Sequence, residues 1–377
     1  MQLGRIAVTL WPLPAVALAA IVVKTEPALT VERVQARPQW SALLGGRLVV
    51  DTLVLRKAVL PQRAINTLSE SMHKRKPAPA VKPAAQKTAD VDWLPRRAVV
   101  EDLTWVNLQG QATTIEADAR LDDAGWPESL NFKITQGALA GTQATLSAQD
   151  ASATQRVWAL KIALGGGTLQ GPLRLTPAPR SGAEIALQAE VETRDVEVSA
   201  LTAPHKLLTG KLEARTTLNA KFAEPASLVD ALQSQTTFTV RGAALQGIDL
   251  AKAVRTVGLN RGGETRLDTL AGQVATHGRA VSLSNLVANS GVLAASGNAT
   301  ISPNRALSGR ISVDLGSKVV GVPLVLGGTL DAPEVTLSRS ALLGAAIGTA
   351  VLPGVGTGAG AKFGDRLGES MKQLFGK

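Results

Sequence analysis

Residues that could perform chemistry are sparse and scattered in this chain. The sequence of 377 residues contains no cysteine, which removes disulfides, thiolate zinc sites and thiol nucleophiles. The three histidines, His73, His205 and His277, lie far apart in the sequence. Two neighbouring carboxylates, Asp122 and Asp123, fall in the segment LDDAG, which is typical of a turn rather than of an acid–base pair. We therefore predict no metal site.

Short motifs of the common enzyme classes are also missing. The sequence holds no G-x-S-x-G elbow, P-loop, H-E-x-x-H pair or dinucleotide-binding glycine pattern, each of which places a nucleophile, a phosphate cradle or a metal at a fixed spacing. We predict that the protein is not an enzyme, with no catalytic residue and no cofactor.

The charge of the chain indicates an anionic partner. There are 40 basic and 30 acidic residues, a balance that suits nucleic acid, phospholipid headgroups or lipopolysaccharide. Tyrosine is absent, and only six tryptophans and five phenylalanines are present. Because single-strand binders stack bases on aromatic side chains, we predict membrane lipids as partners and no nucleic acid.

An uncharged segment near the start predicts a membrane anchor. Ile6 to Val23 comprises 18 mostly apolar residues between Arg5 and Lys24, and a helix of 18 residues is about 27 Å long, close to the hydrocarbon thickness of a bilayer. Residues 1–24 are therefore expected to form a membrane helix. Pro12 and Pro14 weaken this helix, and a cleaved signal peptide remains the alternative.

The next segments differ in composition. Residues 25–70 carry apolar runs around a Gly-Gly turn and predict N-terminal strands. Residues 71–91 form a Lys/Pro/Ala-rich stretch that cannot bury apolar area, and they predict a flexible linker. Contact of its lysines with anionic headgroups is the alternative to a solvated linker.

Alternation of apolar and polar residues dominates from Asp92 to about Leu337. Such alternation places successive side chains on opposite faces of a strand, and the segments are separated by Gly, Asn, Asp and Pro turns. It predicts middle β repeats over residues 92–194 and a further β region over 195–337, both in a long antiparallel array with one apolar face. The candidate residues of that face are Ile185, Leu187, Val191, Leu212, Ala214, Leu218, Ala220 and Phe222.

Helical signals are few. Asp249 can cap a short helix that begins at Leu250. Residues 338–377 form a Gly-rich tail in which Gly356, Gly360, Gly364 and Gly368 repeat at every fourth position and are followed by Phe375. On a helix these glycines would form a smooth stripe that allows close packing against a membrane or partner helix. The alternative is a disordered tail.

The order of these motifs resembles the AsmA family of inner-membrane-anchored, bridge-like lipid-transport proteins. The similarity covers about residues 195–337, where ALQGIDLAKAVRTVG, with Gly247, Asp249 and Leu250, resembles a short helix after a strand. VPLVLGGTLDAPEVTLS, with Gly328 and Pro333, resembles the closing strand pair of the family.

The resemblance implies a fold and a role. The expected fold is mainly β: an elongated, folded antiparallel sheet with an apolar, taco-like groove, short helices, an N-terminal membrane helix and a helical C-terminal tail. The expected role is trafficking of lipid, above all phospholipid, between membranes or outer-membrane assembly. The expected location is the inner membrane of a Gram-negative cell, single-pass, with the bulk in the periplasm and an outer- or inner-membrane protein as partner. A structural or adhesive β-solenoid without lipid transport is the alternative.

Overall fold

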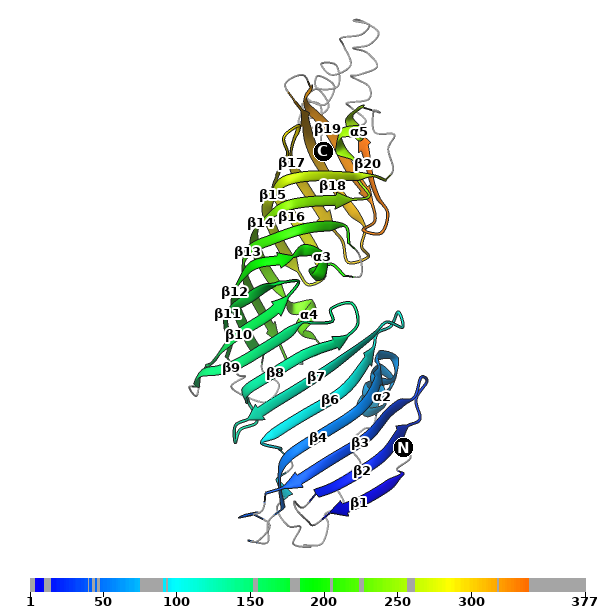
Figure 1. The fold of residues 1–377 in the computed structure, drawn as a ribbon, viewed down its shortest axis with the longest axis vertical. Helices are drawn as coiled ribbons and strands as arrows, with labels where there is room; N and C mark the ends of the chain where they lie inside the picture. Colours follow the sequence, from blue (N-terminus) through cyan, green and yellow to red (C-terminus); the bar gives the residue numbers. More distant parts are fainter. Residues whose placement is uncertain are drawn as a thin grey trace, which may run out of the picture. The chain divides into compact units, whose positions relative to one another are not determined.

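The computed structural model describes residues 4–9, 15–39, 41–42, 45, 48–74, 91–92, 94–151, 155–176, 184–203, 206–223, 227–255, 262–316 and 319–338. The described residues are mainly β, with 72% in strands and few in short helices, which confirms the predicted fold class at this level (Figure 1). The chain divides into two compact units, and the division falls close to β10 and β11. It therefore lies within the span predicted as middle repeats.

The first unit contains the strands up to β10 and one longer helix. Its elements are β1 (Arg5–Thr9), β2 (Ala15–Val23), β3 (Leu29–Pro38), β4 (Leu48–Pro61), α2 (Gln62–Lys74), β5 (Val91–Asp92), β6 (Arg97–Val106), β7 (Ala112–Leu121), β8 (Pro127–Gln136), β9 (Gln143–Ala151) and β10 (Arg156–Leu164).

The second unit contains the remaining strands and three short helices. Its elements are β11 (Gly167–Thr176), β12 (Ile185–Glu197), α3 (Val198–Leu201), β13 (Leu208–Phe222), α4 (Leu228–Ala231), β14 (Gln233–Gln246), α5 (Leu250–Arg255), β15 (Glu264–His277), β16 (Ala280–Asn289), β17 (Leu293–Ile301), β18 (Leu307–Leu315), β19 (Val319–Gly328) and β20 (Pro333–Leu337).

Strands that follow one another in sequence pair in an antiparallel manner through most of both units. This order holds from β1 to β4, from β6 to β9 and from β11 to β20. The exceptions involve β4, which pairs in parallel with the two-residue strand β5 and with β6. Parallel neighbours need a crossover connection, and here α2 lies on it. The antiparallel array predicted from Asp92 onward is confirmed.

The N-terminal segment differs from its prediction. The described residues between Arg5 and Val23 form β1 and β2, which pair with each other, and β2 also pairs with β3. The predicted membrane helix is therefore wrong for these residues, which form strands. Prolines disfavour the helix interior, and strand pairing satisfies the backbone groups instead. Among the described residues, no helix has the length and apolarity needed to cross a bilayer.

Two other boundaries differ from the sequence analysis. The helix α2 continues to Lys74, so the first four residues of the predicted linker 71–91 are helical, and residues 75–90 lie outside the described part of the chain. The candidate docking residues of the tail, Gly356, Gly360, Gly364, Gly368 and Phe375, also lie outside the described residues.

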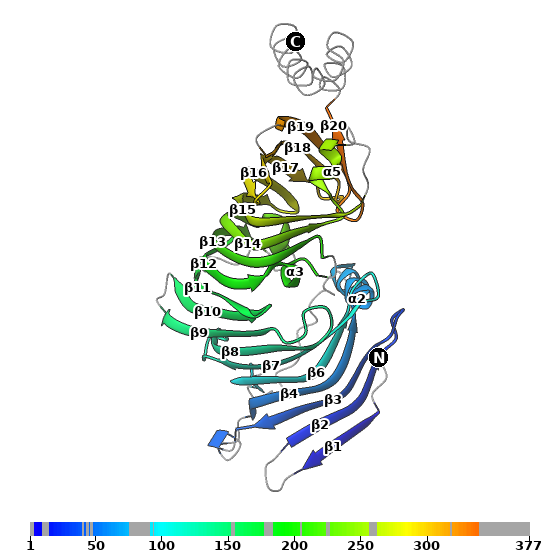
Figure 2. The ribbon, with the colours of Figure 1, turned by 45° about the horizontal axis from the view of Figure 1, so that its top comes forward.

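Bulges interrupt the period-two alternation at mid-strand. Register shifts occur between Thr193 and Val196 in β12 and between Leu283 and Leu286 in β16. Each shift contains a residue with positive φ, Asp195 at 53° in β12 and Asn285 at 52° in β16. Bulges bend a strand and increase its twist, and β12 to β15 curve along their length in Figure 2.

Candidate apolar binding site

The predicted groove residues of β12 and β13 lie on one face of the sheet. Directly opposed residues on neighbouring strands share a face, and Ile185 opposes Phe222, whereas Leu187 opposes Ala220. Val191 opposes Thr216, between Ala214 and Leu218 on the same face of β13. The structure thus brings together all eight candidates.

Burial on this face is uneven. Ala214, Ala220 and Phe222 are buried, at 8%, 4% and 8% exposed. The other candidates, Leu212, Leu218, Ile185, Leu187 and Val191, are partly exposed. The face is therefore partly open along β12 and β13 and is covered at Ala214, Ala220 and Phe222.

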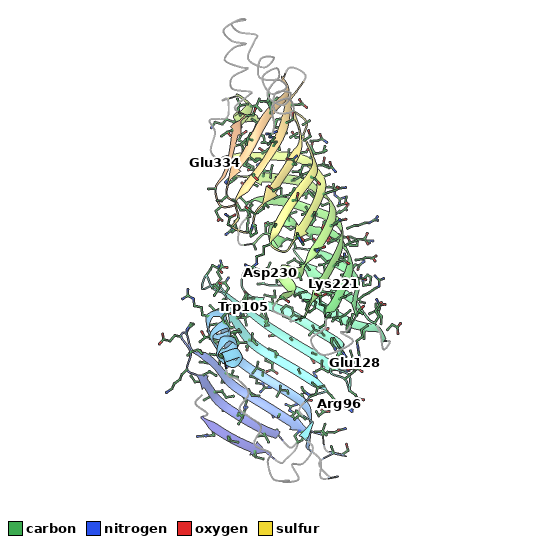
Figure 3. All side chains as sticks on the ribbon, turned by 180° about the vertical axis from the view of Figure 1, so that it is seen from behind. Arg96, Trp105, Glu128, Lys221, Asp230 and Glu334 are labelled. Carbon is green, nitrogen blue, oxygen red and sulfur yellow. The ribbon has the colours of Figure 1, made fainter. Side chains whose placement is uncertain are left out.

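Charged residues occupy the opposite face. Lys211, Arg215 and Lys221 are exposed, and Lys221 is labelled in Figure 3. Arg241 on β14 forms ion pairs with Glu213 at 2.6 Å and with Asp195 at 3.1 Å. This arrangement confirms the predicted division of β13 into an apolar and a polar face.

The apolar face continues beyond β13 to the end of the described chain. Cross-strand partners form one unbroken apolar row from β12 to β19, and its residues are Val196, Leu212, Val240, Leu270, Ala288, Ala295, Val313 and Val322. All but Val196 belong to or pack against a hydrophobic core cluster of the second unit. A parallel row continues through Leu324 on β19 to Leu337 on β20.

An apolar cavity of about 230 Å³ lies on this face of the second unit. Among the described residues that line it, Gln246 and Ser296 are the polar ones. Its apolar wall is contributed by β13 to β20 and by α5, and includes Leu208, Phe238, Leu250, Leu270, Ile311 and Leu326. An apolar cavity of about 150 Å³ can hold a benzene ring, so this cavity can hold a segment of hydrocarbon chain.

The second unit curls at this end, which encloses the cavity. A Cβ added to Gly247, just after β14, would lie 3.6 Å from Cγ of Pro333 at the start of β20, although five strands separate β14 and β20 along the ladder. The motif residues Gly247 and Pro333 are thus neighbours in space. Gly328 adopts a φ of 79° in the turn before β20, where a Cβ would clash with the carbonyl oxygen of Ala332.

The short helix α5 lies over the curled end. It contacts β15, β18 and β20, in agreement with its position in Figures 1 and 2. The carboxylate of Asp249 accepts a hydrogen bond of 2.8 Å from the amide of Lys252, which confirms the predicted cap. Leu250, a motif residue that is 3% exposed, forms part of the cavity wall.

The first unit carries an apolar face of its own, which the sequence predicted from Asp92 onward but not in β1 to β4. Two rows of cross-strand partners are apolar throughout. The first comprises Ile6, Leu18, Val34, Leu55, Val100, Ala117, Phe132 and Ala144, and the second comprises Val8, Val16, Ala36, Leu53, Ala98, Ala119, Leu130 and Leu146. Ile6 and Val8 are 63% exposed, and Val16 is 42% exposed. Alternation predicts which residues of one strand share a face, but the match between residues of different strands requires the register.

Ionisable groups of the first unit lie on its other face. Arg97 on β6 and Asp118 on the neighbouring strand β7 lie on this polar face. The guanidinium of Arg97 donates two hydrogen bonds, of 2.9 and 2.6 Å, to the carboxylate of Asp118. These bonds hold the pKa of Asp118 below its usual range and raise that of Arg97. Asp122 accepts hydrogen bonds from the amides of Ala124 and Trp126, which confirms its predicted place in a turn.

Most of the cavity wall was not predicted from the sequence. None of the eight predicted groove residues lines the cavity, whereas the motif residues Leu250 and Pro333 do. The strands β15 to β18 alternate apolar and polar residues as β13 does. Only the curl of the sheet shows that the apolar residues of these strands line one cavity.

Comparison of the chain with protein-family models, with curated proteins and with solved structures gave no match. Within the described part of the chain, no cluster of three His, Asp or Glu residues forms a candidate metal site. The apolar face and its cavity are therefore the features of the structure from which a function can be proposed.

Proposed function

We propose that this protein is an AsmA-like envelope protein that handles phospholipid by holding acyl chains on its apolar sheet face and in the cavity of the second unit. The motifs around Asp249 and Pro333 support the family resemblance, because they meet in space beside the cavity. The proposal includes an inner-membrane location with the sheet in the periplasm, and a membrane-protein partner for the tail.

The observation that carries the proposal is the unbroken apolar row that leads into an almost wholly apolar cavity. Exposing a methylene to water costs about 0.8 kcal/mol, so two acyl chains with roughly 30 methylenes cost on the order of 24 kcal/mol to expose. An apolar face lowers that cost for a lipid outside a bilayer. Because the cavity offers few polar partners, it suits the tail of a lipid and leaves the headgroup outside.

The partner chemistry agrees with the charge of the chain. The excess of basic residues favours an anionic headgroup in solvent near the protein, while exposed lysines and arginines lie on the face opposite the apolar row. A lipid carrier requires one face that contacts the acyl chain and an opposite face that contacts water.

Lipid extraction from matched variants tests this function. Ala295 lines the cavity, whereas its neighbour Ala294 is exposed on the other face. Full-length protein purified in mild detergent should release phospholipid that mass spectrometry detects. Ala295→Trp should lose most of it because the ring fills the cavity, and Ala294→Trp should retain the wild-type amount.

Circular dichroism of both variants checks that the sheet is intact, and Ala288→Leu provides a smaller obstruction at another wall residue. Wild-type protein that releases no more lipid than an unrelated protein from the same membranes would reject the proposal and favour an adhesive or structural role. Equal lipid in the two tryptophan variants would reject the cavity as the site.

A further inference from the structure

We propose that α5 is the end stop of the acyl-chain site and that the side chain of Leu250 determines how long a chain the cavity accepts. This inference rests on the proposed function, and adds to it a residue that selects among lipids by chain length. It starts from the position of α5 at the curled end of the second unit.

The start of α5 is held to the sheet by a buried hydroxyl. Oγ1 of Thr265, a residue 6% exposed on β15, donates to the carbonyl oxygen of Ile248 at 2.7 Å and accepts from the amide of Leu250 at 2.9 Å. The amide of Gly247 donates to the carbonyl oxygen of Gly263 at 2.8 Å. These bonds fix the backbone at Leu250 and in the three residues that precede it.

Packing fixes the other side of the helix. Ala253 is 1% exposed and belongs to the same hydrophobic cluster as Leu250, and it does not line the cavity. The helix therefore rests on the cluster through Ala253 and presents Leu250 to the cavity. A residue held in this way forms a fixed wall, because neither its backbone nor its helix can move away from a ligand without breaking these contacts.

The wall at Leu250 lies at the curled end of the sheet, where α5 contacts β15, β18 and β20. Gly247 and Pro333 approach each other beside it, and Ile248 and Pro333 complete the lining there. A hydrocarbon chain that fills the cavity would therefore end against Leu250, and its length would be limited at that point.

The expected selectivity follows from the transfer free energy of hydrocarbon. Each additional methylene that the cavity buries is worth about 0.8 kcal/mol, which corresponds to about a fourfold gain in relative occupancy. Removing three carbons from Leu250 should allow longer chains to be buried, whereas a larger side chain should exclude them.

Competition among chain lengths tests the end stop. Full-length protein is stripped of lipid, incubated with an equimolar mixture of saturated fatty acids that differ only in chain length, and separated from free lipid before mass spectrometry. Leu250→Ala should shift the bound distribution toward longer chains by about fourfold per added methylene. Leu250→Phe should shift it toward shorter chains.

Leu267→Ala is the matched control. Leu267 is also 3% exposed and belongs to the same cluster, but it does not line the cavity. This control should keep the wild-type distribution at a similar loss of stability. If Leu250→Ala does not fold, Leu250→Val makes the same test with a smaller change.

The outcomes separate the two proposals. Wild-type protein that binds none of the fatty acids would reject the proposed function and the end stop together. Binding with the same chain-length distribution in the wild type and both Leu250 variants would reject the end stop and leave the proposed function standing. A shift in Leu267→Ala equal to that in Leu250→Ala would also reject the end stop, because loosened packing would then explain both.

Discussion

At the scale of single residues, bulges keep the apolar face continuous across charged positions. In β12 the order is Thr193, Arg194, Asp195, Val196, with the two outer residues buried and the two charged residues exposed. In strict alternation Arg194 and Val196 would share a face. The bulge at Asp195 resets the phase, so that both charged side chains lie on the outer face and Val196 returns to the inner one.

The sequence contains a signal for these bulges that simple alternation misses. The same order of apolar, polar, polar and apolar residues appears at Val100 to Leu103 and at Leu283 to Leu286. In each case the third residue, Asp102 or Asn285, has positive φ, a conformation that Asp and Asn tolerate better than most residues. The regular faces of β13 could be predicted from period two alone, whereas the bulged strands could not.

Acid should weaken the contribution of the Arg97–Asp118 pair. The folded pKa of Asp118 is lowered by its bonds to Arg97, so its stabilising contribution is present above the unfolded pKa, near 3.9, and is lost as the pH falls through the folded pKa. Asp118→Asn should lower the free energy of unfolding at neutral pH by at most about 1 kcal/mol, since both side chains are partly exposed.

Denaturant unfolding measured across this pH range tests the pair. The difference between wild type and Asp118→Asn should shrink as the solution is acidified. Asp123→Asn serves as the control, because Asp123 is 89% exposed where it meets Arg96. A difference that stays constant or grows on acidification would contradict the assignment.

At the scale of elements, the sequence predicted the elements whose signals are local. The cap of α5 needs only Asp249 and the amide three residues later, and the faces of β13 need only alternation. The segment from Ile6 to Val23 shows the opposite case. Its apolarity suits a membrane helix as well as a strand buried against neighbours, and only pairing with β3 distinguishes the two.

The helix α2 and the parallel pair it connects were also missed. Pairing of β4 with β6 depends on a contact between segments about 45 residues apart in sequence, which no local pattern encodes. Residues 62–74 fell in a span interpreted as strands followed by linker. Tertiary pairing therefore decided the structure where propensity was ambiguous.

The hydroxyl of Thr265 should be important for the stability of the α5 end. Thr265→Val removes a donor and an acceptor that bind Ile248 and Leu250 and leaves their buried backbone groups unsatisfied, at a cost of about 1–3 kcal/mol. Thr265→Ser retains the hydroxyl and should recover most of the loss. Thermal unfolding of the three proteins measures this, and a Thr265→Val variant as stable as Thr265→Ser would contradict the role of the hydroxyl.

At the scale of the whole molecule, each unit presents an apolar face built from aligned rows. The rows of the first unit run from Ile6 to Ala144 and from Val8 to Leu146, and those of the second from Val196 to Val322. The sequence predicted a one-sided sheet but not which residues of distant strands are aligned, because alignment depends on register and on the phase shifts at bulges. The cavity was not predictable, since it arises from the curl that brings β20 back to α5.

The central claim is that lipid is held on the apolar face of the sheet and not on the polar face. Photo-crosslinking in cells measures this most directly, with a photoreactive residue introduced singly at Leu212, Leu218, Phe222, Lys211 or Arg215 of β13. Mass spectrometry should find crosslinked phospholipid at the first three positions and little at Lys211 and Arg215, which face water. Equal labelling on both faces, or none at the apolar positions, would contradict the claim.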